Sequence, residues 1–376
     1  MRLLWVLAAL VLTAAASPAS PPHVVSDLPD DSVGFNAPVH ALARAGDVVY
    51  VGGEFSHAIV DGQRYRRAGL AAVDARTGDL LDWAPTADGP VYALATAPSG
   101  LIVGGAFDEL NGEPRRHIGR IGYRDASLDP DLAPKVYGEV RALAVGHGRV
   151  YAAGEIKAVG AVERSKLAAF WLDNGELDQD WYPRADQQVH ALAVSGGRVY
   201  AGGAFETLNG SADYDHFAAV HPVTGEIDTS FDPKVHVLVR NVHIGEHGIY
   251  AALGGQGGRL VAYTSTGEER WRVTADGDMQ AIAEYKGVVY GGGHFDAVCR
   301  SDRTGDFGMC LDGSQERYKL LAADLTGQLL PWAPDADGVI GVAALAVAGG
   351  KLAAGGTFTT LGSGEIPQLR FATFSP

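Results

Sequence analysis

The chain has 376 residues, of which 47% are hydrophobic, so it can bury a large core. Its formal net charge is −15, with 45 acidic residues against 30 basic ones. This balance argues against a protein that binds nucleic acid or an anionic membrane, because either partner needs a basic face. A neutral or cationic partner is compatible with the charge.

Residues 1–16 are predicted to be a signal peptide. Arg2 supplies the positive end, an apolar stretch runs from Leu3 to Leu12, and small alanines follow at 14–16. The apolar stretch is too short to predict a membrane anchor, and no later segment is long enough to span a bilayer. We therefore expect a protein that is secreted, periplasmic or on the cell surface. Residues 17–30 are predicted to be a linker, and 31–376 a single domain.

A segment of about fifty residues recurs seven times along this domain. Its first apolar run begins at Val39, Val91, Val140, Val189, Val239, Met279 and Val342. Each repeat contains four short apolar stretches, which in the first repeat are 39–43, 48–53, 70–74 and 80–83. Short stretches rich in valine, alanine, leucine and aromatics between glycine-rich turns predict strands. The sequence therefore predicts an all-β, seven-bladed β-propeller of four-stranded antiparallel blades.

Two motifs suggest how the blades pack. Glycine pairs such as Gly52-Gly53 lie late in the second strand, where glycine usually marks a bulge or a close backbone approach. The fourth strand tends to end in Trp-x-Pro, as at Trp83, Trp181 and Trp332. We expect these bulky side chains to fill the wedge between neighbouring blades.

The two ends of the domain complement each other. The seventh repeat stops after its third strand, at 369–374, and residues 33–38 weakly match the end of a fourth strand. We expect the N-terminal strand to complete the last blade, which would remove the exposed sheet edge.

Two repeats depart from the pattern. The fifth is shortened by a glycine-rich hairpin at 254–258, and the sixth carries an insertion at 295–318. The insertion holds Cys299 and Cys310, which are predicted to form a disulfide in an oxidising compartment. A metal site or a reactive thiol are the alternatives. The inserted loop is a candidate contact surface or an inert insertion.

The motifs Val-x-Ala-Leu, Val-Tyr-x-Gly-Gly-x-Phe and Trp-x-Pro, which span residues 33–376, resemble a secreted bacterial β-propeller repeat family of unknown function. That family is similar to the ectodomain of the fungal cortical cell-polarity marker. The resemblance implies a propeller in an extracellular or surface setting, and it brings no catalytic residue. A weaker similarity of residues 72–83 to quinoprotein (PQQ-like) repeats makes a quinone-dependent oxidoreductase the least favoured alternative.

One position of the repeat carries large polar side chains. It follows the first residue of each first strand, and we call it the collar: His40, Tyr92, Arg141, His190, Arg240, Gln280 and, in the last repeat, Ala343. First strands line the central channel of a propeller, so these side chains are expected to converge near its mouth. They could bind an anion, a carboxylate or a sugar. A solvated channel wall is the alternative.

Aspartates precede four of these strands: Asp88, Asp186, Asp276 and Asp337. They could hold Ca²⁺ at the channel mouth or pair with the basic residues of the collar. Alternatively, each is a turn residue that bonds its own backbone. No other cofactor is predicted.

The sequence has no recognisable catalytic signature, such as a nucleophile elbow or a zinc-protease helix. We therefore expect an exported, non-enzymatic binding or scaffold module, a monomer that binds a protein or glycan on one face. The alternative is a carbohydrate-active hydrolase or lyase with its site at the channel mouth.

Overall fold

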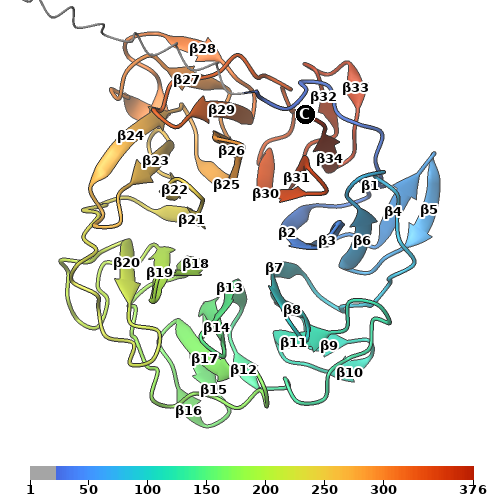
Figure 1. Ribbon diagram of the computed structural model, residues 1–376, viewed down its shortest axis with the longest axis vertical. Helices are drawn as coiled ribbons and strands as arrows, with labels where there is room; N and C mark the ends of the chain where they lie inside the picture. The colour runs from blue at the N-terminus through green and yellow to red at the C-terminus, as the bar shows by residue number, and fades with distance from the viewer. Residues whose placement is uncertain (1–22) are drawn as a thin grey trace, which may run out of the picture.

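The computed structural model describes residues 23–376, so the predicted signal peptide lies outside the described residues. Antiparallel sheets of three or four strands, which contain the repeated segments, surround a common centre (Figure 1). Their innermost strands are β2 (Val39–Ala45), β7 (Val91–Ala97), β13 (Val140–Gly146), β18 (Val189–Ser195), β21 (Val239–Ile244), β25 (Met279–Tyr285) and β30 (Val342–Ala348). These strands begin at the seven residues that the repeat predicts.

Each innermost strand pairs with a second strand, which pairs with a third. The second strands are β3 (Val48–Gly53), β8 (Gly100–Gly105), β14 (Arg149–Gly154), β19 (Arg198–Gly203), β22 (Ile249–Leu253), β26 (Val288–Gly293) and β31 (Lys351–Gly356). The third strands are β6 (Leu70–Asp74), β11 (Ile118–Ile121), β17 (Leu167–Trp171), β20 (Phe217–Val220), β23 (Arg259–Tyr263), β29 (Leu320–Asp324) and β34 (Phe371–Phe374).

Four strands were predicted in every blade, but only one sheet of the described residues has four. In that sheet β24 (Glu269–Thr274) pairs with β23. In five other sheets the fourth segment makes a single bridge to the third strand, as Val73 does with Leu80. Those five segments run into a proline within a few residues, whereas β24 contains none. Proline cannot donate a ladder hydrogen bond, so the chain turns away after one bridge.

Short strands extend from the sheets in the connections between the main strands. They are β1 (Gly34–Phe35), β4 (His57–Val60), β5 (Gln63–Arg66), β9 (Glu109–Leu110), β10 (Glu113–Pro114), β12 (Val136–Tyr137), β15 (Ala158–Val159), β16 (Val162–Glu163), β27 (Ala297–Cys299), β28 (Ser314–Glu316), β32 (Thr360–Leu361) and β33 (Ile366–Pro367). The 3-10 turn η1 (Asp306–Gly308) is the one helical element among residues 23–376. Within that range, no helix has the length and apolarity needed to cross a membrane.

The core is divided into clusters that lie between neighbouring sheets. Tyr50 and Leu70 of the first sheet, for example, pack with Leu101 and Phe107 of the second, and all four are buried. The glycine pairs permit close approach: a Cβ on Gly53 would lie 2.2 Å from the carbonyl oxygen of Pro38. Crowding near the centre therefore accounts for the glycine late in the second strand.

The tryptophans tie one sheet to the next. Trp83 and Trp181 are buried, and their indole Nε1 atoms donate to the carbonyls of Gly122 (2.8 Å) and His221 (3.2 Å) in the following sheet. Besides filling the space between neighbouring sheets, as predicted, each tryptophan forms a hydrogen bond from one sheet to the next. A buried indole N–H needs such an acceptor.

The N-terminal segment lies against the last sheet, in part through the residues that the sequence suggested: Phe35 N donates to Leu369 O over 2.9 Å, and Arg370 Nη1 donates to Phe35 O over 3.0 Å. β1, within the predicted 33–38, pairs with β4 of the first repeat. The hydrogen bonds to the β34 edge come from further upstream: Ser26 N donates to Ser375 O, and Asp30 N donates to Thr373 O, each over 2.7 Å. Residues 26–30, assigned to a linker from the sequence, therefore lie beside β34.

Candidate functional site

The collar residues share one backbone feature. In all seven innermost strands, the pairing register with the second strand shifts at the collar position, which marks a β-bulge. The residue before it, such as Val39 or Val189, is fully buried, whereas the collar residue itself is half-buried. A bulge re-aims the side chain that it carries. The same irregularity thus presents one collar side chain from every sheet.

A cavity of about 210 Å³ lies among the innermost strands. It is lined by the collar residues His40, Tyr92, Arg141, His190 and Ala343, and by a ring of leucines that includes Leu42, Leu94, Leu143 and Leu192. The structure therefore brings four of the six predicted polar collar residues into one cavity. Arg240 and Gln280 occupy the equivalent strand position but do not line it.

Two further polar residues line the cavity and were not predicted: Asn241 and His243 of β21. They replace alanines that occupy these positions in most other repeats, as Ala41 and Ala43 do in the first. The signal was therefore present in the sequence as a break in the Val-x-Ala-Leu pattern.

Contacts within the collar orient its side chains. The Arg141 guanidinium carbon lies 3.8 Å from the centre of the Tyr92 ring, a cation–π contact, and Arg141 Nε donates to Glu139 Oε2 over 2.8 Å. His40 Nε2 lies 2.9 Å from Glu54 Oε1. Each of these collar groups therefore has a fixed partner on its own or the neighbouring sheet.

Arg240 is held in a similar way, because its Nη2 donates to Asp278 Oδ2 over 2.9 Å. The two collar arginines, Arg141 and Arg240, are each matched by an acidic residue. The collar is thus rich in hydrogen-bonding groups without being strongly cationic.

The pKa of His190 differs from that of an exposed histidine. Burial lowers its pKa to about 4, and the positive charges of Arg240 and Arg141 contribute in the same direction. At neutral pH its ring is therefore uncharged, with one nitrogen that accepts and one that donates hydrogen bonds. Burial also raises the pKa of Tyr92, which keeps its hydroxyl protonated.

We expect the His190→Gln variant to lose less stability on acidification than the wild type. Because the folded-state pKa lies below the ordinary value of 6.5, the unfolded chain takes up the proton first as the pH falls from 6.5 towards 4. The shift corresponds to about 3 kcal/mol, and we expect about 1–2 kcal/mol in practice because solvent screens a partly exposed ring. Urea unfolding of both proteins at pH 7 and pH 4.5 measures this difference. Equal acid sensitivity of the two proteins would contradict it.

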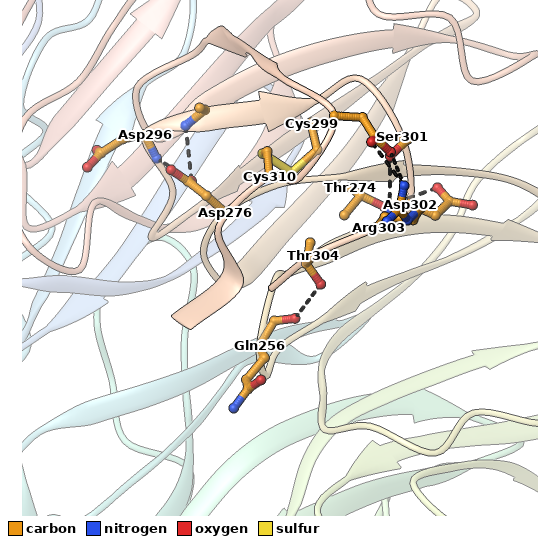
Figure 2. Close-up of a disulfide and its surroundings, with 12 residues drawn as sticks. Gln256, Thr274, Asp276, Asp296, Cys299, Ser301, Asp302, Arg303, Thr304 and Cys310 are labelled. Atoms are coloured by element: carbon orange, nitrogen blue, oxygen red, sulfur yellow. Dashed lines mark hydrogen bonds and ion pairs between the residues drawn. A yellow bond between two sulfur atoms is a disulfide. The ribbon is translucent and has the colours of Figure 1, made fainter. Parts of the chain in front are cut away.

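The carboxylates of the four aspartates accept hydrogen bonds from backbone amides. Asp88 Oδ1 accepts from the amides of Asp108 and Glu109, both at 2.9 Å, and Asp276 accepts from Asp296 and Ala297 in the same way (Figure 2). The equivalent pairs of donors are Glu206 and Thr207 for Asp186, and Thr359 and Thr360 for Asp337.

Each aspartate thus accepts hydrogen bonds from backbone amides of a loop some twenty residues further along the chain, and does not bond the backbone of its own turn. Partial burial raises the pKa of Asp186, but the amides of Thr207 and Glu206 outweigh it and the net shift is downward. Among the described residues, the four aspartates do not form a common group of metal-binding side chains. The Ca²⁺ site remains a prediction without a supporting cluster.

The insertion of the sixth repeat forms a second surface feature. Cys299 and Cys310 form a disulfide, and Thr304 Oγ1 donates to Gln256 O in the shortened fifth repeat over 3.1 Å (Figure 2). The insertion thus contacts the short hairpin at 254–258, which replaces a longer loop in the fifth repeat. It leaves Phe307 96% exposed, with Met309 and Leu311 also exposed nearby.

Comparisons with known proteins establish the fold but no closer relationship. No protein-family model and no curated protein matches the chain. Among solved structures, it is similar to the WD40 β-propeller domain of Doa1, with a TM-score of 0.57 and 13% sequence identity over 94% of this chain and 97% of that one. It is also similar to the computationally designed Ika8 protein, with a TM-score of 0.50 and 16% identity over 91% and 98% of the two chains. The protein is therefore a β-propeller.

Proposed function

We propose that the protein is an exported, non-enzymatic binding module that recognises a glycan at the collar. In this proposal the ring has seven blades, and residues 26–35 close it against the last one. The resemblance to secreted propeller repeats and the predicted signal peptide support an extracellular setting. The β-propeller fold is compatible with a binding or scaffold role.

The observation that carries the proposal is the pairing of each collar arginine with a carboxylate. Arg141 is bonded to Glu139 and Arg240 to Asp278, so an incoming anion would compete with a resident acid. Neighbouring hydroxyls of a sugar can donate to the carboxylate and accept from the guanidinium at the same time. A polyol therefore fits this collar better than a phosphate or a carboxylate does.

Neutral His190 and the protonated Tyr92 hydroxyl add donors and acceptors of the same kind. The leucines beneath them offer an apolar floor, which suits the carbon face of a pyranose ring. The cavity volume of about 210 Å³ is enough for a single sugar residue of a longer chain. We therefore expect recognition of a terminal sugar, with the rest of the glycan on the propeller face.

A glycan array that contains neutral and acidic glycans, screened with and without Ca²⁺, tests the proposal. We expect binding to neutral glycans and no Ca²⁺ requirement. For the best glycan, the variant Arg141→Gln/Arg240→Gln should bind at least tenfold more weakly in calorimetry, because each lost bidentate donor costs about 1–3 kcal/mol. Arg76→Gln, which removes an exposed arginine outside the collar, is the matched control and should bind like the wild type.

Unchanged affinity in the double variant would remove the collar as the binding site. Binding only to acidic glycans would contradict the argument from the paired arginines. Mass analysis of the glycan after overnight incubation separates binding from turnover, and a shortened product would favour a hydrolase or lyase.

A further inference from the structure

A carboxylate lies where four of the other six repeats have an aliphatic side chain and the first two have Arg44 and Thr96. Glu284 of β25 is five residues after Met279, and the same position in four other repeats is Val145, Val194, Ile244 or Val347. Its side chain is only 4% exposed. Burying a carboxylate in an apolar position is costly unless it is paired or binds a cation. Glu284 is paired here with His247, whose backbone amide donates to Oε2 over 3.2 Å and whose ring Nδ1 lies beside Oε1.

The neighbouring hairpin turn between β21 and β22 makes room for this carboxylate. A Cβ on Gly245 would lie 1.9 Å from Glu284 Oε2, so a larger residue would displace this carboxylate. The turn brings two potential ligands: His247 Nδ1 lies 2.5 Å from Glu284 Oε1, and Glu246 is next to it in the chain. Donor atoms of Glu246, His247 and Glu284 all lie within 4.8 Å of one another.

A second observation points to the same place. The hydroxyl of Tyr250 is fully buried and has no hydrogen-bond partner among the described residues. The corresponding tyrosines of other repeats are all partnered: Tyr50 donates to Tyr123 O, Tyr151 donates to Pro222 O, and Tyr290 accepts from Val25 N.

The Tyr250 ring lies beside the same glycine, because the Cβ built on Gly245 would also lie 2.9 Å from Tyr250 Cε2. Burial raises the pKa of Tyr250, and the nearby Glu284 carboxylate raises it further. The hydroxyl lies close enough to the Glu284 carboxylate to interact with it but lacks a well-aligned hydrogen bond, and such a group suits a bound water or a metal-bound ligand.

The surrounding charges permit a cation. Arg270 is the nearby positive side chain, and its Nη1 donates to the carbonyl of His247 over 2.7 Å, so it holds the turn. His243 stacks on Tyr250 with ring centres 6.3 Å apart, and burial lowers its pKa, which keeps it neutral. Two carboxylates and one histidine thus lie together, with their ligand atoms within 4.8 Å of one another.

We propose that Glu246, His247 and Glu284 form a binding site for a divalent first-row transition metal ion such as Zn²⁺. Nitrogen and carboxylate ligands at about 2.0–2.2 Å are typical of zinc, and three protein ligands leave one position for water. The Tyr250 hydroxyl is placed to bond that water or the buried carboxylate. Ca²⁺ is disfavoured because it takes six to eight oxygen ligands and the site offers a histidine. The site is independent of the collar, since Glu284 and Gln280 lie at opposite ends of β25.

Calorimetric titration of ZnCl₂ and CaCl₂ into the metal-free full chain, prepared without a polyhistidine tag, tests the site. We expect one Zn²⁺ per chain at micromolar affinity and no measurable Ca²⁺ binding. Zn²⁺ should also raise the melting temperature, and Co²⁺ should give visible absorption bands of a four-coordinate site.

Two variants keep the result interpretable. Glu284→Val inserts the residue that the repeat itself uses at this position, so it should fold and melt above the metal-free wild type, yet bind Zn²⁺ at least fiftyfold more weakly. His247→Ala should weaken binding to a similar extent. His236→Ala is the matched control, because His236 is also an exposed histidine beside a carboxylate, Asp215, and its loss should change nothing.

No saturable Zn²⁺ binding, or binding that Glu284→Val leaves intact, would overturn the proposal. In the first case His247 and Glu284 form only an ion pair, and the extra stability of Glu284→Val would remain to be measured. Binding lost in His236→Ala but retained in His247→Ala would place the metal elsewhere.

Discussion

A variant that lacks residues 26–38 is expected to lose most or all of its folded stability. This segment contributes Val33 and Phe35, which are 3% and 0% exposed, and their burial alone is worth about 3–6 kcal/mol. Phe35 packs between Phe55 of the first sheet and Phe371 of the last, with ring centres 4.3 and 6.1 Å away. Since the total stability of a domain is about 5–15 kcal/mol, losses on this scale should prevent stable folding.

The hydrogen bonds of the segment add to this effect. Trp332 Nε1 donates to Ser26 O over 3.0 Å, as Trp83 does to Gly122 O in the first two repeats. Asp30 accepts from Ser375 Oγ and forms an ion pair with Lys351 at 3.0 Å. The N-terminus therefore accepts the indole hydrogen bond that Trp83, Trp181 and Trp271 each donate to the next repeat along the chain.

Circular dichroism and thermal melting measure the outcome. Leu28→Ser is the matched control, because Leu28 lies in the same segment but is 65% exposed, and it should melt within a degree or two of the wild type. A truncated protein that melts like the full chain would show that the ring does not need its N-terminal segment.

Trp181→Ala is expected to cost about 3–5 kcal/mol of unfolding free energy. The Trp181 side chain is fully buried, its ring centre lies 5.0 Å from that of Tyr151, and it packs against Phe205 and Leu208 of the next sheet. Truncation leaves a cavity between two sheets that each have a rigid backbone, so little relaxation can fill it. The His221 carbonyl would lose its indole donor as well.

Trp181→Phe provides the comparison. Phe231 occupies the equivalent position in the fourth repeat and packs on Tyr200 with ring centres 5.1 Å apart, so the architecture accepts a smaller ring. We expect this variant to cost about 1–2 kcal/mol, mainly through the lost hydrogen bond and the smaller volume. Denaturant titrations of the wild type and the two variants measure their free energies of unfolding. Similar losses of unfolding free energy in the alanine and phenylalanine variants would show that Trp181 does not act by filling the space between the sheets.

The repeat could be recognised from the sequence because the residues that determine the strands and turns of each unit lie within that unit. Alternating apolar residues, glycine pairs and turn residues specify strand, bend and strand within about fifty residues. The starting residues of all seven innermost strands follow from this pattern, as does the position of Trp83 and Trp181 in the core. The disulfide between Cys299 and Cys310 was also predicted, since the chain has no other cysteine.

Contacts between repeats could not be predicted in the same way. Asp88 was assigned either to a metal or to its own turn, but its partners are amides twenty and twenty-one residues further on. The N-terminal strand was placed by its weak similarity at 33–38, and Phe35 does bond to Leu369, but the bonds from residues 26 and 30 to Ser375 and Thr373 were not predicted. A local pattern carries no information on which distant backbone group will lie within hydrogen-bond distance.

The sequence by itself determined the all-β architecture, the repeat boundaries and the identity of the collar residues, because these depend on periodicity and on the chemistry of single side chains. Only the tertiary structure decided that each collar residue lies in a bulge, that His190 is neutral between two arginines, and that Glu284 faces the turn of the preceding sheet. Burial and electrostatic environment arise when sheets far apart in the chain pack together, so they depend on distances that no single repeat contains.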